Sequence, residues 1–416
     1  MSSERADLIV IGAGPGGYRA AEYAASQGLR VTVVERALVG GTCLNRGCIP
    51  TKAYAHSASL AEAVERRDRI VEQLRAGVEQ LLAAPGITLL RGAARMAGPD
   101  RVEMPDGTVL QAPHIIIATG SQARMIRAEG IDTDPRVLTS TGLLELRELP
   151  RRLCIVGAGV IGMEMACAFR RFGSEVTVIE YLRECLPMLD SDVAKRLRKL
   201  MERQGIAFRM KTAVSSLSDI DADAILIATG RRPLTEGLGL ENAGIEPDAA
   251  GAIPVDDNMQ SAQPTLYAIG DVNGRQLLAH AAEMQALRAV NHILGRADSI
   301  RLDVMPSAIF TSPEAACVGP SEDQLKAQGQ DYRCRKAFWR ANGKALAMNQ
   351  AEGLLKLFTD ADERLIGCHA FGAHAADIVQ EAAALITLGA TLQQLRGIVH
   401  IHPTLSEVLM QAALQD

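Results

Sequence analysis

Apolar residues open the chain in two short uninterrupted runs, separated by a glycine-rich turn and an alanine-rich stretch. The first run, Leu8 to Ile11, leads into Gly12-Ala-Gly-Pro-Gly-Gly17, and the second, Val31 to Val34, ends in Glu35. This order predicts a buried strand, a tight turn, a helix and a second strand. Such a unit binds a pyrophosphate at the helix N-terminus and a ribose hydroxyl at the acid, so it predicts a dinucleotide site.

The same pattern returns near the middle of the chain. Leu153 to Val156 leads into Gly157-Ala-Gly159-Val-Ile-Gly162, and a later apolar run ends in Glu180. In both copies the acid follows the first glycine by 23 residues, from 12 to 35 and from 157 to 180. One such turn on its own also joins strand to helix without any ligand. Two copies with matching acids indicate two dinucleotide-binding folds on one chain.

Three further apolar runs fit these two folds. Ile115 to Gly120 and Ile225 to Gly230 both end in Ala-Thr-Gly, where glycine lets a cofactor approach the backbone closely. Thr265 to Asp271 ends in an acid suited to hydrogen-bonding a polyol chain.

Beyond Arg301 no such glycine turn recurs, and a third domain with its own sheet is predicted. Its strand-like runs are 308–311, 354–358 and 365–370, with a helical stretch over 375–388.

The bulk composition excludes several classes of protein. The 416 residues exceed what one core holds and predict two to four domains. A net charge of −5 without runs of Lys or Arg gives no reason to expect nucleic-acid binding. No apolar stretch approaches the ~18 residues that a membrane span needs. The N-terminus leads straight into a strand, so we expect no targeting segment, no membrane contact and a cytoplasmic location.

Two of the eight cysteines, Cys43 and Cys48, lie shortly after the first dinucleotide unit, in Gly40-Gly-Thr-Cys-Leu-Asn-Arg-Gly-Cys-Ile-Pro-Thr-Lys52. In a reducing compartment, such a pair more often serves redox or metal chemistry than structure. Zinc sites pair C-x2-C units with further ligands at regular spacing, which this chain lacks, so we expect no metal. A dithiol here is placed to pass electrons to the dinucleotide. The single cysteines are expected to be small buried residues: Cys154, Cys167, Cys185, Cys317, Cys334 and Cys368.

A candidate base for thiol chemistry lies near the C-terminus. Thiol–disulfide exchange needs a group that takes and returns protons. In His402-Pro-Thr-Leu-Ser-Glu407, the acid can hold the imidazole of His402 in one tautomer and stabilise its cation. The spacing alone favours an ordinary surface histidine, because nothing in the sequence places His402 near Cys43.

Taken together, these motifs resemble those of the FAD-dependent pyridine nucleotide-disulfide oxidoreductases and, within that family, the dihydrolipoamide dehydrogenase branch. The similarity rests on the cysteine run, both glycine turns, Thr265-Leu-Tyr-Ala-Ile-Gly-Asp-Val272 and the run that starts at His402. It continues in order over nearly the whole chain, through Leu277-Leu-Ala-His280 and Pro306-Ser-Ala-Ile-Phe-Thr-Ser-Pro-Glu314.

The resemblance implies an α/β protein with two Rossmann-like dinucleotide-binding domains, one for FAD and one for NAD, and a C-terminal α+β dimerisation domain. The FAD-binding domain is expected in two parts, residues 1–140 and 246–303. The NAD-binding domain is expected over 141–245 and the dimerisation domain over 304–416.

The resemblance also implies a role for each site residue. Cys48 would be the thiolate next to the flavin, Cys43 the sulfur that exchanges with substrate, and His402, held by Glu407, the base from the other subunit. Glu164 would pair with Lys52 beside the flavin. FAD would be bound by Gly12, Gly14, Gly17, Glu35, Thr42, Lys52, Gly120, Asp271 and Ala279. NAD would be bound by Gly157, Gly159, Gly162, Glu180, Val214 and Gly230.

The implied activity is the oxidation of a dihydrolipoyl group by NAD through FAD and a Cys43–Cys48 disulfide. The implied assembly is a homodimer that serves a lipoylated carrier protein or a domain of a multienzyme complex. The segments 53–91 and 206–222 are shorter than this resemblance leads us to expect, which leaves the disulfide substrate open.

Two alternatives remain at this point. Within enzymes, the chain could reduce another disulfide, such as glutathione, although Val160 stands where glutathione reductases carry a tyrosine lid. A mercuric reductase is disfavoured because the chain does not end in a cysteine pair. Outside enzymes, it could be a flavoprotein subunit whose main role is to dock in a complex.

Overall fold

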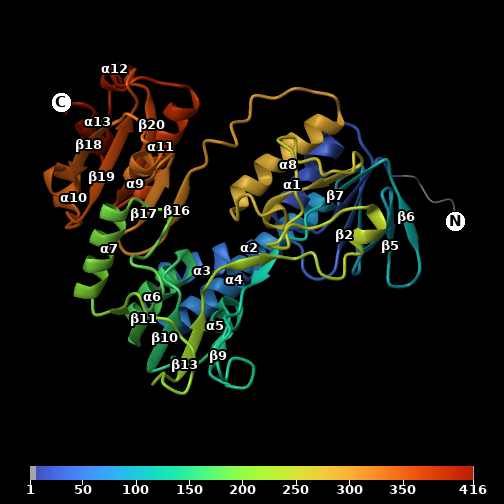
Figure 1. Ribbon diagram of the computed structural model, residues 1–416, viewed down its shortest axis with the longest axis horizontal. Helices are drawn as coiled ribbons and strands as arrows, with labels where there is room; N and C mark the ends of the chain where they lie inside the picture. The colour runs from blue at the N-terminus through green and yellow to red at the C-terminus, as the bar shows by residue number, and fades with distance from the viewer. Residues whose placement is uncertain (1–5, 416) are drawn as a thin grey trace.

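The computed structural model describes residues 6–415, which form three five-stranded sheets with their own helices (Figure 1). Two of these sheets are wholly parallel and the third is antiparallel. This confirms the predicted fold class, because two parallel Rossmann-like sheets precede a separate C-terminal α+β domain. The domain boundaries stay predictions.

The first sheet has the strand order β15-β7-β1-β2-β3. All four residues of β1 (Leu8–Ile11) are buried, as a parallel strand covered on both faces requires. Helices α1 and α8 pack together over one face, and a three-stranded meander covers the other. The remaining elements are β2 (Val31–Glu35), β3 (Ile87–Arg91), β7 (His114–Ile117), β15 (Leu266–Ala268), α1 (Pro15–Ser26), α8 (Ala279–Ile293) and the meander strands β4 (Arg95–Gly98), β5 (Arg101–Glu103) and β6 (Val109–Gln111).

The cysteine pair lies on two short helices that follow β2. Cys43 belongs to α2 (Gly41–Arg46), and Cys48 is the first residue of α3 (Cys48–Ala55). The longer helix α4 (Leu60–Leu82) then leads to β3, and the Ser59 hydroxyl caps it by accepting from the Glu62 N–H. The segment 53–91, which we noted as short, holds the end of α3, all of α4 and β3.

The second sheet has the order β12-β11-β10-β13-β9 and repeats the arrangement of the first. No meander lies between β12 and β13 in the described chain; loop residues around Ile131 and Leu217 cover that face instead. Strand β9 lies just before the predicted boundary at residue 140. The elements are β9 (Val137–Leu138), β10 (Arg152–Val156), β11 (Glu175–Ile179), β12 (Ala207–Arg209), β13 (Ala224–Ile227), α5 (Ser140–Glu145), α6 (Val160–Phe172) and α7 (Ser191–Arg203).

A two-stranded antiparallel ribbon connects the two parallel sheets. Its strands, β8 (Ser121–Ala123) and β14 (Arg231–Pro233), each follow one of the two Ala-Thr-Gly sequences. The hydroxyl of Thr119 donates to the carbonyl of Leu234 at 2.8 Å, and that of Thr229 donates to the carbonyl of Arg124 at 2.9 Å. The sequence repeat therefore reappears as a nearly two-fold symmetric link between the sheets.

The third sheet has the order β16-β17-β20-β19-β18, and all its neighbours are antiparallel. Helices α11 and α13 pack on it around the third core. Figure 1 shows this domain, in orange and red, reached by a long segment after α8. The elements are β16 (Ser307–Ile309), β17 (Ala315–Val318), β18 (Arg333–Phe338), β19 (Leu354–Thr359), β20 (Leu365–Phe371), α9 (Glu322–Gln328), α10 (Gly343–Ala347), α11 (Ala375–Thr387), α12 (Leu392–Arg396) and α13 (Glu407–Ala413).

Buried charges join the second and third domains. The Lys356 ammonium, 1% exposed, donates to both carboxylate oxygens of Asp190 at 2.7 Å and to Glu322 Oε2 at 2.7 Å. Asp190 also caps α7 by accepting from the Val193 N–H at 3.4 Å, and it accepts from the Glu322 N–H at 3.1 Å. We call Asp190, Glu322 and Lys356 the Asp190 cluster. Its contacts join α7 to β19 and α9.

Within residues 6–415, no helix is both long and apolar enough to cross a membrane.

Candidate active site

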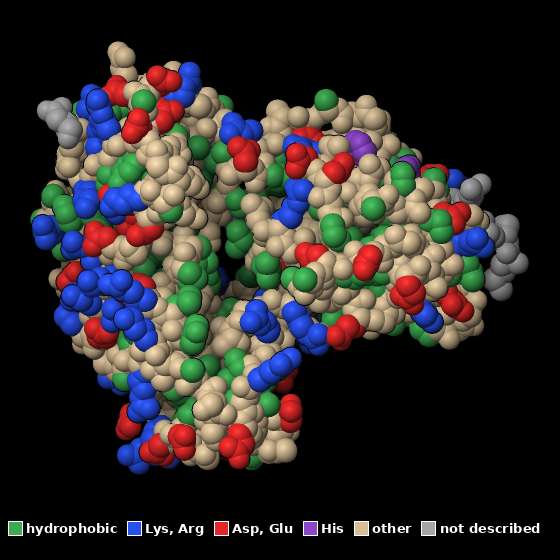
Figure 2. All heavy atoms as spheres, viewed as in Figure 1, with side chains coloured by type: hydrophobic (Ala, Val, Ile, Leu, Met, Phe, Trp, Pro, Cys, Tyr) green, Lys and Arg blue, Asp and Glu red, His purple; other side chains and the backbone are tan. Residues whose placement is uncertain are grey.

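A large cavity lies where the three domains meet, and it holds most of the predicted site residues. Its volume is about 2680 Å³, and Figure 2 shows the molecule hollowed between its lobes. The lining includes both glycine turns, Cys43, Cys48 and residues that follow β16. This central cavity therefore connects the two predicted dinucleotide sites with the predicted dithiol.

Both glycine turns leave room for a bound group at their middle glycine. Gly14 and Gly159 precede α1 and α6 with φ of −74° and −79°, which other residues also adopt. A Cβ at Gly159 would meet no heavy atom within 4 Å, and one at Gly14 would meet only the Cα of Gly41, at 3.8 Å. Contacts within the chain therefore do not require glycine at these two positions. A pyrophosphate bound against the helix N-terminus would require it, so both turns fit a dinucleotide.

The last glycine of each turn serves packing instead. A Cβ at Gly17 would collide with the carbonyl oxygen of Gly12, and one at Gly162 would collide with that of Gly157. Helix and strand can therefore approach closely only with glycine at these positions.

The two acids that end β2 and β11 are held in the same way. Glu35 accepts from the N–H of Ala13 at 2.7 Å and from the N–H of Ala37 at 2.8 Å. Glu180 accepts from the two equivalent N–H groups at 2.6 and 2.7 Å. Both carboxylates line the central cavity beside their glycine turns. This placement fits the predicted contact with a ribose in each copy.

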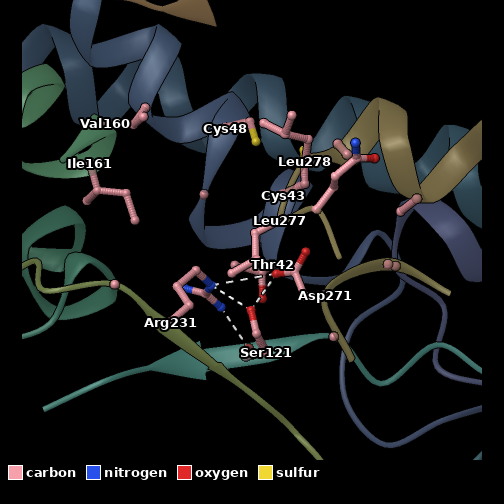
Figure 3. A pocket seen from close by; sticks show the side chains of 18 of the residues that line it. Thr42, Cys43, Cys48, Ser121, Val160, Ile161, Arg231, Asp271, Leu277 and Leu278 are labelled. Carbon is pink, nitrogen blue, oxygen red and sulfur yellow. Dashed lines mark hydrogen bonds and ion pairs between the residues drawn. The ribbon is translucent and has the colours of Figure 1, made fainter. Parts of the chain in front are cut away.

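Cys43 and Cys48 both lie at the central cavity (Figure 3). The interaction with Cys43 and the charge of Lys52 together lower the pKa of Cys48 to about 7, against the opposing effect of partial desolvation. The interaction with Cys48, together with desolvation, raises the pKa of Cys43. The direction of these two shifts fits the predicted role of Cys48 as the thiolate next to the flavin.

Lys52 and Glu164 form the ion pair expected beside the flavin. The Lys52 ammonium donates to both carboxylate oxygens of Glu164 at 3.0 Å, and the Glu164 side chain is only 4% exposed. The backbone N–H of Phe310 donates to Glu164 Oε1 at 2.8 Å, and the Lys52 Nζ lies 4.3 Å from the centroid of the Phe310 ring. Three domains thus contribute to one charged contact on the cavity wall.

Asp271 takes part in a contact that the sequence did not reveal. Its carboxylate accepts a short hydrogen bond from the Ser121 hydroxyl, and Arg231 Nε lies 3.8 Å from it (Figure 3). Arg231 also donates from Nε to the Ser121 hydroxyl and from Nη2 to the Ser121 carbonyl, both at 2.7 Å. Both partners come from the ribbon β8–β14, so Asp271 is fixed at the cavity wall by the link between the sheets.

The remaining predicted cofactor residues also line the central cavity: Thr42, Gly120, Ala279, Val214 and Gly230. The described residues contain no group of three or more His, Cys, Asp or Glu side chains that could hold a metal ion.

His402 and Glu407 lie outside the cavity lining of their own chain. His402 Nδ1 lies 2.9 Å from Glu407 Oε1, and the Thr404 N–H donates to the other oxygen at 2.8 Å. These hydrogen bonds, first that from His402, lower the pKa of Glu407. The His402 side chain is 79% exposed, with its Nε2 edge free of any hydrogen bond in the described chain. The predicted pair therefore forms, but apart from the cysteines of its own chain.

Sequence reasoning missed Ser121, Arg231 and Phe310. The first two directly follow the repeated Ala-Thr-Gly sequences, and that repetition is the signal that could have drawn attention to them. Phe310 lies inside the quoted run Pro306–Glu314, but no spacing rule connects it to Lys52.

Comparison with known proteins identifies the family. The model of the pyridine nucleotide-disulphide oxidoreductases matches residues 6–286, and that of their dimerisation domain matches residues 305–413. The chain belongs to this family. The predicted resemblance is confirmed, and the chain is a flavoprotein disulfide oxidoreductase whose cofactors are FAD and NAD(H).

Individual relatives cover nearly the whole chain. Dihydrolipoyl dehydrogenase 1, mitochondrial, from Arabidopsis thaliana is 36% identical, covering 99% of this chain and 90% of the relative. Dihydrolipoyl dehydrogenase from Thermus scotoductus is 40% identical, covering 98% and 96%. Among solved structures, the HOCl-induced flavoprotein disulfide reductase RclA from Escherichia coli has a TM-score of 0.92 at 30% identity, covering 98% and 99%. The Arabidopsis alignment spans 459 positions, so that relative carries segments that this 416-residue chain lacks.

Proposed function

We propose that this flavoprotein is a dihydrolipoyl dehydrogenase, which oxidises a dihydrolipoyl group and passes the electrons to NAD. The observation that carries the proposal is the central cavity, whose lining includes Cys43 and Cys48 together with both glycine turns. Full-length relatives at 36–40% identity that bear this name support the substrate class.

The two thiols take different roles in this proposal. Cys48 is the thiolate beside the flavin, because Cys43 and Lys52 stabilise its negative charge. Cys43 exchanges with substrate. Bound FAD supplies the two-electron chemistry between the dithiol and the nicotinamide.

The reaction with substrate balances as two thiol–disulfide exchanges. A substrate thiol loses its proton to His402 and attacks Cys43 of the Cys43–Cys48 disulfide, and Cys48 leaves as a thiolate. After His402 has released this first proton to solvent, it takes the proton of the second substrate thiol. That thiolate attacks the first substrate sulfur and displaces Cys43 as a thiolate, which takes the second proton from the imidazolium. The substrate dithiol is thereby oxidised to a disulfide, and the protein disulfide is reduced to a dithiol. Glu407 stabilises the positively charged His402 during these transfers.

His402 reaches the cysteines in this proposal only from a partner subunit. The C-terminal domain exposes large apolar side chains: Val399 and Ile401, close to His402 in the sequence, are 95% and 78% exposed, and Leu388 is 81% exposed. A dimerisation domain that presents such residues fits a two-fold interface with a second copy. We therefore propose a homodimer in which His402 of one subunit serves Cys43 of the other. The substrate would be a lipoylated carrier protein or domain.

Steady-state turnover tests the proposed substrate. Reduction of NAD should be fast with dihydrolipoamide, while NADH oxidation with glutathione disulfide should be at least ~100-fold slower in kcat/KM, roughly 2.8 kcal/mol. The Cys43→Ser variant is the control for reaction at the dithiol. Faster turnover of glutathione disulfide, or turnover with neither, would reject this substrate class.

A further inference from the structure

Lys52 has a second neighbour besides Glu164, and it comes from another domain. The ring of Phe310, directly after β16, lies 4.3 Å from the Lys52 Nζ. The backbone N–H of the same residue donates to Glu164 Oε1 at 2.8 Å. Phe310 therefore contacts the ammonium and the carboxylate of one ion pair at the same time.

Both contacts restrain the ion pair. The face of an aromatic ring carries partial negative charge and attracts a cation within about 6 Å of its centroid. Lys52 is a flexible side chain that remains 28% exposed to the central cavity, and two of its three N–H donors are directed to Glu164. Without the ring, the ammonium would be held from one side only and could turn toward the open cavity.

The position of this ammonium matters to Cys48. Four charged or titratable groups act on that sulfur: Cys43, Lys52, Glu164 and Arg231. Lys52 and Arg231 favour the thiolate, whereas Glu164 disfavours it. If Lys52 moves away, the Glu164 carboxylate is no longer compensated, and the thiolate forms only at higher pH.

We propose that Phe310 is a positioning residue, whose ring and backbone N–H hold the Lys52–Glu164 pair so that the ammonium faces Cys48. The inference rests on the proposed role of Cys48 as the flavin-facing thiolate. It also gives the dimerisation domain a part in the redox centre of its own chain, because β16 carries Phe310 to a contact between α3 and α6.

The pH midpoint of the thiolate–flavin charge-transfer absorbance in the two-electron-reduced holoenzyme tests this role. Phe310→Leu should raise the midpoint by at least about half a pH unit, which is about threefold less thiolate at a given pH. Phe310→Tyr, which keeps an aromatic face, should leave it within about 0.2 unit. Phe338→Leu is the matched control. The Phe338 ring also faces a cation, with the Arg340 Cζ 4.5 Å from its centroid, but Phe338 does not line the central cavity. Its removal should leave the midpoint unchanged.

A double-mutant cycle separates positioning from a general structural effect. In a Lys52→Met background, Phe310→Leu should not move the midpoint further, because the ring acts through the ammonium. A wild-type midpoint in Phe310→Leu, or an equal shift with and without Lys52, would overturn the inference.

A second measurement tests the inference in case the Phe310→Leu variant loses its flavin. If Phe310→Leu does not retain FAD, the rate of iodoacetamide labelling of Cys48 in the apoprotein is measured against pH, and its midpoint replaces that of the absorbance. The two proteins compared are Cys43→Ser and the double variant Cys43→Ser/Phe310→Leu, so that only Cys48 of the pair is labelled. The same half-unit rise is expected, and its absence overturns the inference. Neither measurement uses dihydrolipoamide, so a wrong substrate assignment leaves both readouts intact.

Discussion

At the scale of single residues, we expect Glu180 to decide which nicotinamide dinucleotide binds well. Its carboxylate is held by two backbone N–H groups beside Gly159, where it can accept from both ribose hydroxyls and repel a 2′-phosphate. We expect kcat/KM with NAD to exceed that with NADP by at least ~10-fold, roughly 1.4 kcal/mol. Glu180→Gln should narrow the ratio, because it removes the repulsion. Equal kcat/KM values with NAD and NADP in the wild type would contradict this expectation. They would indicate that the exposed Arg183, three residues after Glu180, pairs with the 2′-phosphate of NADP.

The two cysteines should differ in their spectra. We expect Cys48 to carry the thiolate near neutral pH, since Cys43 and Lys52 lower its pKa to about 7. Two-electron reduction of the wild type should therefore produce a long-wavelength charge-transfer band that strengthens as pH rises through about 7. Cys48→Ser should abolish the band while FAD stays bound, and Cys43→Ser should keep it even with oxidised flavin. The opposite pattern would mean that the two roles are exchanged.

At the scale of elements, the Asp190 cluster should be a main source of stability between α7 and the third sheet. Lys356→Met leaves the buried Asp190 carboxylate without its cation, so we expect it to lower the free energy of unfolding by about 3–5 kcal/mol. Lys336→Met on the neighbouring strand is the matched control. Its ammonium is 43% exposed and 3.9 Å from Asp192, so the change should stay within about 0.5 kcal/mol. Urea unfolding measures the free energy of unfolding of both variants. Similar decreases in the two would contradict a stabilising role for the Asp190 cluster.

The same cluster predicts a dependence of stability on pH. Burial alone would raise the pKa of Glu322, but hydrogen bonds from Lys356 and Lys326 lower it from 4.5 to about 2. Since the folded pKa is depressed, this carboxylate stabilises the fold above pH 4.5, and its contribution is lost as the pH falls from there through about 2. The Tm of the wild type should therefore fall more steeply across this window than that of Glu322→Gln. Parallel Tm curves would contradict the assignment.

At the scale of the whole molecule, we expect assembly of two subunits to decide whether an active site is complete. His402 lies outside the cavity of its own chain, so we expect Cys43→Ser and His402→Ala subunits to complement each other when mixed. Each parent homodimer has two dead sites, whereas a mixed dimer has one site with both defects and one with none. Random exchange of equal amounts makes about half the dimers mixed, so activity should recover to about a quarter of wild type. Mass spectrometry checks that subunits exchange, and no recovery despite exchange would reject the shared site.

Most of the fold and the cofactor cradles could be read from sequence, because the interactions that define them are local. Gly17, for example, cannot carry a Cβ because of the carbonyl of Gly12, and both residues belong to the same glycine-rich turn. Likewise Glu35 is tied to Ala13 and Ala37 by the strand–turn–helix unit itself. Where the chain repeats the unit, the same hydrogen bonds recur, so the second cradle was as predictable as the first.

The sequence by itself determined the two dinucleotide folds, the dithiol beside the first of them and the His402–Glu407 pair, since each lies within one short stretch of chain. Only the tertiary structure decided that Arg231 and Ser121 fix Asp271, that Lys356 neutralises Asp190, and that Phe310 faces Lys52. These contacts join residues more than a hundred positions apart, and they depend on how three sheets pack against one another. Packing of that kind is set by the summed shape and burial of whole faces, which no short motif encodes.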